Sequence, residues 1–434
     1  MSSVAFIGLG CSKNTTDLEY LMGYLRDSGV DIVNDISSSD YIVINTCGFI
    51  EPSVMEAIEN IVQTGEKKPE GAKIIAAGCM VERFKDEFEE EFPEVDFYTG
   101  VHTLKEAGDF ILEDSKLRID ESRTYGSARI ISNHPYYAYI KIADGCDNRC
   151  SYCTIPSIRG GLKSRPEESI IKEVGNLISN GVKEIILISQ DSTKYGLDLY
   201  GESRLVQLVE KINDLPGDFF IRLLYLNPDG INKSDIRRFP EIEKLVKYFE
   251  IPVQHISDKI LSKMRRKSDS RKIKDVFSNI RAEMPEAFIR TTFIVGFPGE
   301  DENDFSELKG FLKDFAPDYA GFFGFQPEEG TKAFDMPDYV DNETVENRIS
   351  ELESIQEQNT VERLKKMQNE EILAFAEGFS EDIEFIPEGR AVFQTPEIDG
   401  KTFFIDGRAD RGYGPYKCSI EKIVYPDIYC KIVS

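Results

Sequence analysis

Apolar and polar positions along the first hundred residues alternate between two periods. Three short apolar runs have the length and composition of buried strands: Val4–Leu9, Tyr41–Ile44 and Lys73–Ala77. Three other stretches repeat their apolar residues at helical spacing: Leu18–Asp27, Ser53–Thr64 and Glu82–Glu91. Strands that alternate with helices in this way predict an open parallel α/β sheet of flavodoxin-like type.

The same alternation continues in the middle of the chain. Six further apolar runs predict strands: Tyr137–Ala143, Glu184–Ser189, Phe219–Leu226, Tyr248–Val253, Ile289–Val295 and Tyr319–Phe325. Helical stretches lie between them: Pro166–Asn180, Ser203–Asp214, Asp258–Met264, Lys272–Glu283 and Asp301–Phe315. Six β/α units predict a partial parallel (β/α)6 barrel that is open on one side.

The pattern changes again near the C-terminal end. Asn342 begins a long polar segment whose apolar residues recur at helical spacing as far as about Ile372, which predicts an amphipathic linker helix. Short runs rich in β-branched and aromatic residues then predict a small antiparallel β-barrel: Arg390–Thr395, Lys401–Ile405, Lys417–Val424 and Ile428–Val433. The expected division is an N-terminal domain (1–115), a linker (116–136), the partial barrel (137–341), the linker helix (342–373) and the small β-barrel (374–434).

Charge limits what the C-terminal barrel can bind. The chain of 434 residues has 52 Lys and Arg against 78 Asp and Glu, a formal net charge of −26. From Glu381 onward there are seven basic and ten acidic residues. Such a surface repels phosphate backbones and attracts basic partners, so the sequence favours a basic protein over nucleic acid.

Composition also indicates the compartment. No stretch has the roughly 18 apolar residues of a membrane span. The opening MSSVAFIGLGCS lacks the basic region and long apolar core of a signal peptide. We therefore expect a cytoplasmic protein without membrane contact, in which the eight cysteines bind metal or act in catalysis rather than form disulfides.

Three cysteines lie close together in the sequence. Cys146, Cys150 and Cys153 form a C-x3-C-x2-C array, and three thiolates at this spacing can hold three irons of a cubic iron-sulfur cluster. The fourth iron is then open to a small chelating molecule, as in radical S-adenosylmethionine (SAM) enzymes. A zinc knuckle or a chance clustering of cysteines is the alternative, but zinc normally has a fourth Cys or His ligand, and the nearest candidate, His134, lies before a predicted strand.

Three more cysteines are dispersed. Cys11, Cys47 and Cys79 each follow the carboxyl end of a predicted strand, the edge at which open α/β sheets bind their ligands. Each also lies beside glycine, which lets the backbone pack closely around a bulky cofactor. These cysteines are either ordinary core residues or, as we favour, ligands of a second cluster. Cys418 and Cys430 lack metal-site spacing and are expected to be ordinary strand residues.

Polar residues at the carboxyl ends of the predicted barrel strands add to the candidate site. They are Ser189, Gln190, Asp191 and His255. Asp191 can hold a cationic amino group, and Gly296 and Gly299 can admit a flat nucleoside close to the backbone. His255 is a candidate general base, although a lone histidine beside a strand end more often packs or forms hydrogen bonds.

Longer motifs around these residues resemble the radical SAM methylthiotransferase family along essentially the whole chain. They are LGCSKNTTDLE (9–19), NTCGFI (45–50), AAGCMVERF (76–84), PEVD (93–96), ADGCDNRCSYCTIPSIRG (143–160), ISQDSTKYG (188–196) and TTFIVGFPGE (291–300). The resemblance implies an auxiliary 4Fe-4S cluster on Cys11, Cys47 and Cys79, and a SAM-binding 4Fe-4S cluster on Cys146, Cys150 and Cys153. It also implies a TRAM-like fold for the small barrel, and SAM contacts from Tyr152, Ser189, Gln190, Asp191, Ile294 and Gly296.

The substrate in this family is either an adenosine of tRNA or an aspartate of a ribosomal protein. The ribosomal-protein branch is resembled by IPSIRGGLKSRP (155–166), IRLLYLNPDG (221–230), PVQHISDKILSKMRR (252–266), EEGTKAF (328–334) and TPEIDG (395–400), whereas Asn227 and Phe325-Gln326-Pro327 depart from its pattern. This branch implies methylthiolation at the β-carbon of an aspartate in small-subunit ribosomal protein twelve, with flavodoxin or ferredoxin as electron donor. The net charge of −26 also favours a basic ribosomal protein over tRNA as the substrate. A tRNA adenosine methylthiotransferase and an iron-sulfur electron carrier are the alternatives.

Overall fold

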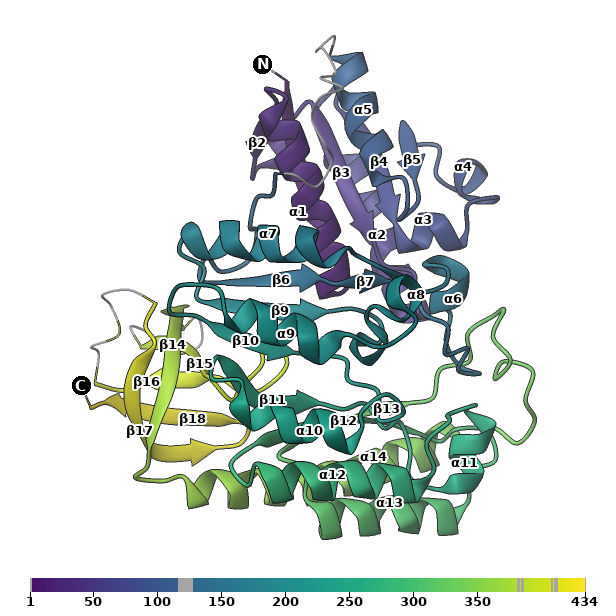
Figure 1. Cartoon of the computed structure of the whole chain (residues 1–434). Coiled ribbons are helices and arrows are strands. Elements are labelled where there is room, and N and C mark those ends of the chain that lie inside the picture. Colours follow the sequence, from purple (N-terminus) through teal and green to yellow (C-terminus); the bar gives the residue numbers. More distant parts are fainter. Residues whose placement is uncertain are drawn as a thin grey trace. The chain divides into compact units, whose positions relative to one another are not determined.

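The computed structural model describes residues 2–115, 128–380, 383, 386–406, 409 and 413–433 (Figure 1). The chain forms two compact units. The first contains Met1–Arg165, Ile188–Gln190 and Gln326–Phe334, and the second contains Pro166–Leu187, Asp191–Phe325 and Asp335–Ser434. Most of the predicted linker 116–136 lies outside the described residues, and the predicted domain limits stay a prediction.

The first unit contains the predicted flavodoxin-like sheet. Its strands are β1 (Ser3–Gly8), β2 (Asp31–Val33), β3 (Tyr41–Thr46), β4 (Lys73–Gly78) and β5 (Phe97–Thr99). They pair in parallel in the order β2-β1-β3-β4-β5, which is the flavodoxin order. The sequence pattern missed β2 and β5 because each has only three residues.

Helices cover both faces of this sheet. They are α1 (Ser12–Asp27), α2 (Glu51–Lys67), α3 (Cys79–Arg83), α4 (Phe88–Glu91) and α5 (Leu104–Asp114). One core lies between the sheet and α1 and α5, and the other lies between the sheet and α2, α3 and α4. The single helix predicted over Glu82–Glu91 is wrong: the chain turns between α3 and α4, so that Met80 and Phe88 both enter the second core.

The remaining elements of the first unit flank the cysteine array. They are β6 (Tyr137–Lys141), β7 (Ala143–Asp144), α6 (Ile155–Ile158) and β8 (Lys163–Ser164). The β7 and β8 strands pair antiparallel, Ala143 opposite Ser164, so the array lies in a loop whose two ends are held together. Next to β6, the N–H of Ile142 donates to the carbonyl of Ile188 at 2.9 Å.

The second unit contains the other strands of the partial barrel. They are β9 (Glu184–Ile188), β10 (Phe220–Leu223), β11 (Leu245–Glu250), β12 (Phe288–Val295) and β13 (Tyr319–Gly324), parallel in the order β13-β12-β11-β10-β9. With β6, all six predicted strands are present. The main helices between them are α7 (Glu167–Ser179), α9 (Leu205–Asn213), α10 (Lys233–Arg238), α11 (Asp258–Lys263), α12 (Ser270–Glu283) and α13 (Glu302–Phe315), and the sequence pattern missed α10.

The linker helix and the small barrel complete the second unit. Helix α14 (Asn342–Lys366) is shorter than predicted, because Glu371 already begins a strand that pairs with two others in the barrel. The closed barrel contains β14 (Glu371–Phe379), β15 (Pro387–Ala391), β16 (Thr402–Phe404), β18 (Asp427–Ile432) and β17 (Tyr416–Val424), in that order (Figure 1). The expected antiparallel arrangement holds except that β16 and β18 pair in parallel.

A buried ionic cluster joins the small barrel to the parallel sheet within the second unit. Glu184, at the start of β9, accepts a hydrogen bond from Arg222 Nε at 2.7 Å and forms an ion pair with Arg390 of β15. All three side chains are buried. Burial disfavours the carboxylate of Glu184, but the two guanidinium groups outweigh this effect and lower its pKa.

Candidate functional site

The three dispersed cysteines lie at one edge of the first sheet. Cys11 is the residue before α1, Cys47 follows β3, and Cys79 follows β4 as the first residue of α3. The strands that lead to them, β1, β3 and β4, are direct neighbours in the sheet. Residues separated by 30 or more positions are therefore brought together by the strand order, as predicted from the sequence.

Glycines beside these cysteines allow close approach. Gly10 has a positive φ of +90°, and a Cβ atom there would lie 2.9 Å from Cys47 Cβ and 3.1 Å from Cys47 Sγ. At Gly48, a Cβ atom would lie 2.6 Å from Met80 Cα. Since real Cβ atoms do not approach so closely, both positions require glycine, and the cysteine loops are packed against one another.

The thiols of this triad share one electrostatic environment. Cys47 and Cys79 are buried, whereas Cys11 is exposed. Burial raises the pKa of Cys79 to about 11, although the nearby Arg159 acts in the opposite direction. Burial also raises the pKa of Cys47, and the charge of Cys11 adds to this effect. Without a positive charge nearby, three thiolates would be costly here, so a cation must accompany them.

Arg159 supplies one such positive charge. It follows the cysteine array in sequence, is buried, and donates to both carboxylate oxygens of Asp144 at 3.1 and 3.0 Å. Its Nη2 atom donates to Asp17 Oδ2 at 3.1 Å and to Cys79 Sγ at 3.5 Å. Lys141 forms ion pairs with the same two carboxylates. The sequence analysis missed these four charged residues, although all but Lys141 lie within motifs that it identified.

Asn14 was also missed, and it connects the three dispersed loops. Its side-chain amide donates to the carbonyls of Leu9 and Thr46, both at 3.0 Å. Its Oδ1 atom accepts from Arg159 at 2.6 Å and from the Cys79 thiol at 3.4 Å. The signal for its role was its place three residues after Cys11, in the first turn of α1.

The local array adopts a compact loop. Cys146 N–H donates to the carbonyl of Gly160 at 3.0 Å, and Cys153 N–H donates to the carbonyl of Cys150 at 3.2 Å. The three thiols are partly exposed. Tyr152 lies in the same loop and is half-buried.

A segment distant in sequence, 326–334, connects both cysteine-bearing regions. Glu328 is buried and accepts from the N–H of Glu51, the first residue of α2, at 2.8 Å and from Arg83 Nη1 at 2.9 Å. Arg83 Nη1 also donates to the carbonyl of Gly48 at 3.0 Å. The N–H of Ala333 donates to the carbonyl of Ser151 at 2.8 Å. Segment 326–334, called the strap below, thus contacts residues beside both Cys47 and Cys150.

The structure separates the predicted SAM contacts into two groups. Tyr152, Ser189 and Gln190 belong to the unit that contains all six cysteines. Gln190 Nε2 donates to Asp144 Oδ1 at 3.1 Å, while its Oε1 atom is buried without a hydrogen-bond partner among the described residues. A buried polar atom without a partner suits a role in ligand binding.

The other predicted contacts, Asp191, Ile294 and Gly296, belong to the second unit. Asp191 is buried; its carboxylate accepts from Thr193 N–H at 3.2 Å and from Asn227 Nδ2 at 3.2 Å. It therefore also has a structural role, as the N-cap of a short 3-10 helix.

His255 and Gly296 are connected through Glu300. The N–H of Gly296 donates to Glu300 Oε2 at 2.8 Å, and Arg348 Nη1 donates to Glu300 Oε1 at 2.8 Å. His255 Nδ1 accepts from Ser257 N–H at 3.0 Å, and its Nε2 atom lies 3.4 Å from Glu300 Oε2. The Nε2 atom is buried and forms no hydrogen bond with a described residue. The hydrogen bond at Nδ1 gives His255 a structural contact, and its role as a general base stays a prediction.

The donor sets suit iron-sulfur clusters. Among the described residues, no three His, Cys, Asp or Glu side chains lie close enough to share one metal ion. In a cubic cluster each thiolate binds its own iron, so the ligands stand further apart. The described residues include two sets of three thiols, one beside the buried Arg159 and one in a partly exposed loop. In the same described part of the chain, no helix is long and apolar enough to cross a membrane.

Comparisons with known proteins agree on a family. The profile of the uncharacterized protein family UPF0004 matches residues 3–100, and that of the radical SAM superfamily matches residues 140–312. The ribosomal protein uS12 methylthiotransferase RimO of Aquifex aeolicus is 41% identical over 93% of this chain and 91% of its own length. RimO of Thermotoga maritima is 41% identical over 91% of this chain and 92% of its own length.

A solved structure has a similar fold. The radical SAM methyltransferase TsrM from Kitasatospora setae, with cobalamin and a [4Fe-4S] cluster bound, has a TM-score of 0.56 at 14% identity. The match covers 77% of this chain and 74% of TsrM. At this identity the likeness concerns the fold alone.

Proposed function

Because the chain belongs to the family of ribosomal protein uS12 methylthiotransferases, we propose that it adds a methylthio group to the β-carbon of an aspartate in uS12. The observation that carries the proposal is the presence of two cysteine triads in one compact unit, together with relatives of this name that match nearly the whole chain. A simple iron-sulfur electron carrier would have no need of SAM, whereas the radical SAM profile matches residues 140–312. The small C-terminal barrel has the fold expected of a TRAM-like domain.

The cofactors are SAM and 4Fe-4S clusters. Cys146, Cys150 and Cys153 would hold the cluster that binds SAM, and Cys11, Cys47 and Cys79 would hold the auxiliary one. When bound, they supply reductive cleavage of SAM to a radical that can take hydrogen from an unactivated carbon, and the sulfur that is transferred.

The protein's own residues prepare these sites. Arg159 balances the charge of the thiolates beside Cys79 and fixes the loop after Cys153 through Asp144. The side chain of Asn14 joins the loops that carry the dispersed cysteines through hydrogen bonds. The strap at 326–334 holds the segments after Cys47 and Cys150. Since these contacts are made within folded protein, both thiol triads are pre-organised before any cofactor binds.

Charge supports uS12 over tRNA. A protein of net charge −26 repels a phosphate backbone and attracts a ribosomal protein rich in Lys and Arg. We further propose that the reaction takes place in the cytoplasm and that flavodoxin or ferredoxin delivers the electrons.

The test is an anaerobic assay with purified uS12, SAM, reductant and reconstituted enzyme, read by mass spectrometry of uS12 peptides. We expect one methylthio group on an aspartate, and no such peptide with Cys11→Ala or Cys146→Ala. Cys418→Ala, which removes a thiol from the small barrel, should keep the activity. SAM cleavage with no modified uS12 peptide would contradict the proposed substrate, and tRNA would then be assayed.

The proposed SAM contacts need a separate test. Tyr152, Ser189, Gln190 and Asp191 are proposed to contact SAM, together with the backbone at Ile294 and Gly296. Calorimetry should show that Gln190→Ala weakens SAM binding to the cluster-loaded protein about tenfold, as expected for a lost hydrogen bond to a charged ligand. For Asp191, Thr193→Val is the matched control because it removes a structural partner alone. Unchanged SAM affinity in Asp191→Asn would remove that residue from the site.

A further inference from the structure

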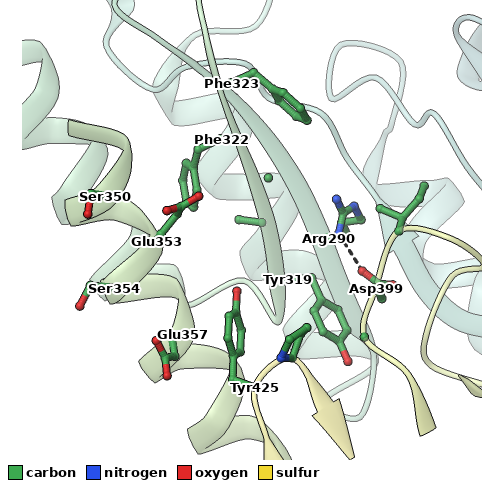
Figure 2. Close-up of a pocket in the computed structure, with 15 residues that line it drawn as sticks. Arg290, Tyr319, Phe322, Phe323, Ser350, Glu353, Ser354, Glu357, Asp399 and Tyr425 are labelled. Carbon is green, nitrogen blue, oxygen red and sulfur yellow. Dashed lines mark hydrogen bonds and ion pairs between the residues drawn. The ribbon is translucent and has the colours of Figure 1, made fainter. Parts of the chain in front are cut away.

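A groove of about 700 Å³ runs along β13 in the second unit, between α14 and loops of the small barrel (Figure 2). Strand β13 stands at the end of the strand order, and its residues Ala320 and Gly321 line the groove. None of the six site cysteines lies in it. An edge strand beside an open groove is a common place for an extended peptide to bind.

The groove carries unbalanced negative charge. Arg290 and Asp399 neutralise each other through a hydrogen-bonded ion pair of 2.7 Å, and Asp399 also accepts from Tyr248 at 2.8 Å. Glu353 and Glu357, on α14, are exposed and form no ion pair with any described residue. Two carboxylates therefore face the groove without a cation among the described residues to balance them.

Aromatic side chains lie between these charges. Phe323 is 59% exposed and Tyr425 is 38% exposed, so both rings offer apolar surface to the groove. In Figure 2, Tyr425 lies near Glu357, with Phe323 at the opposite end of the groove. Glu353, Glu357 and Tyr425 line the same groove, and the two carboxylates add to the effect of burial, which raises the pKa of Tyr425.

We propose that this groove docks an extended, lysine- or arginine-bearing segment of a basic protein. A Lys or Arg side chain can place its charge beside Glu353 and Glu357 and its methylene stem against Phe323 or Tyr425. A nucleic acid would bring its phosphates to unpaired carboxylates, and a purely apolar segment would bury those carboxylates without partners. The inference concerns docking and does not rest on the proposed transfer reaction, because it needs no SAM and no turnover.

The test is fluorescence anisotropy with the cluster-loaded full chain and a fluorescein-labelled peptide of alternating lysine and glycine. The double variant Glu353→Gln/Glu357→Gln should weaken binding about tenfold at physiological salt, since two close charge pairs are lost. Phe323→Ala should weaken it about threefold, the value expected of one cation–π contact. All three residues are exposed, so the variants should fold.

The matched control removes the same charge elsewhere. Glu307→Gln/Glu362→Gln changes two exposed carboxylates outside the groove and should alter binding less than twofold. Equal weakening by both double variants would overturn the proposal in favour of long-range attraction to the acidic protein. A concentration-dependent dimer in sedimentation that Phe323→Ala dissociates would overturn it in favour of a second copy of the chain.

Discussion

The Nη2 atom of Arg159 lies 3.5 Å from the Sγ atom of Cys79. Arg159 follows the local cysteine array by six residues, whereas Cys79 belongs to the dispersed triad. One guanidinium group thus contacts a proposed ligand of the auxiliary cluster and, through Asp144, the start of the loop that carries the other three cysteines. The two sites share a charged residue, and a change at Arg159 should be felt at the auxiliary one.

The first prediction concerns the redox potential of the auxiliary cluster. A hydrogen bond and positive charge at a ligating sulfur stabilise the reduced cluster. Arg159→Gln should therefore lower its midpoint potential by about 40 mV, the one-electron equivalent of about 1 kcal/mol. A redox titration followed by electron paramagnetic resonance measures this. Arg165→Gln, whose guanidinium donates to Tyr20 and to the carbonyl of Lys141, is the control and should leave the potential unchanged.

The second prediction uses two glycines with the same backbone conformation. Gly10→Ala and Gly29→Ala both place a side chain at φ +90°, which costs about 1 kcal/mol in each case. A Cβ atom at Gly10 would meet Cys47, whereas one at Gly29 would meet nothing within 4 Å. Gly10→Ala should lose the auxiliary cluster, about half of the bound iron. If Gly29→Ala loses as much iron, strain rather than the clash with Cys47 is responsible.

The third prediction concerns the strap at 326–334. Glu328→Gln replaces the buried carboxylate that accepts from Glu51 N–H and from Arg83. Since this loosens the segment after Cys47, a chelator should remove iron roughly tenfold faster, equivalent to about 1.5 kcal/mol for a hydrogen bond to a charged group. Glu329→Gln is the control, because it makes the same charge change at an exposed neighbouring residue. Equal rates for both variants would assign the strap no role at the cluster.

The fourth prediction concerns the buried ionic cluster between β9 and the small barrel. Glu184→Ala leaves Arg222 buried without a carboxylate and leaves Arg390 with Glu377 alone, so the free energy of unfolding of the second unit should fall by about 3–5 kcal/mol. Glu210 pairs with Arg238 at 2.5 Å, but both side chains are about 40% exposed. Glu210→Ala should consequently cost less than about 1 kcal/mol in the same denaturant titration.

The fifth prediction is the pH dependence of that stability. The folded pKa of Glu184 lies below its ordinary value of 4.5, because the arginines outweigh burial. Its contribution is therefore complete above pH 4.5 and is lost as the pH falls toward the folded pKa. The difference in unfolding free energy between the wild type and Glu184→Gln should shrink over this range. A difference that stays constant as the pH falls would show that the ionised carboxylate contributes nothing.

Much of the fold could be predicted because its signals are local. The runs that became β1, β3, β4 and the six barrel strands are long and apolar, and every cysteine loop has its own glycine. The strands β2 and β5 are too short to show an alternation of apolar and polar residues. The start of β14 was missed because the helical pattern was extended over it. The parallel pairing of β16 with β18 depends on which distant strands meet, and no local pattern reports that.

The candidate ligands of the site could be predicted from the sequence, but the residues that position those ligands could not. Cysteine type and spacing identify thiolate chemistry directly, whereas Asn14, Arg159 and Glu328 act through partners more than 30 residues away. Their roles become visible only when the strand order and the loop positions are known. His255 shows the same limit, since the hydrogen bond from the Ser257 N–H to its Nδ1 atom becomes visible only in the folded chain.

The spacing of the two triads has a consequence for how the protein is assembled. Cys146, Cys150 and Cys153 lie within eight residues, so a nascent or unfolded chain can already present them together at little loop-closure cost. Cys11, Cys47 and Cys79 meet only after β1, β3 and β4 have paired. The auxiliary cluster can therefore be inserted only after the N-terminal sheet has folded, so its presence indicates that folding is complete. The local array can bind iron earlier.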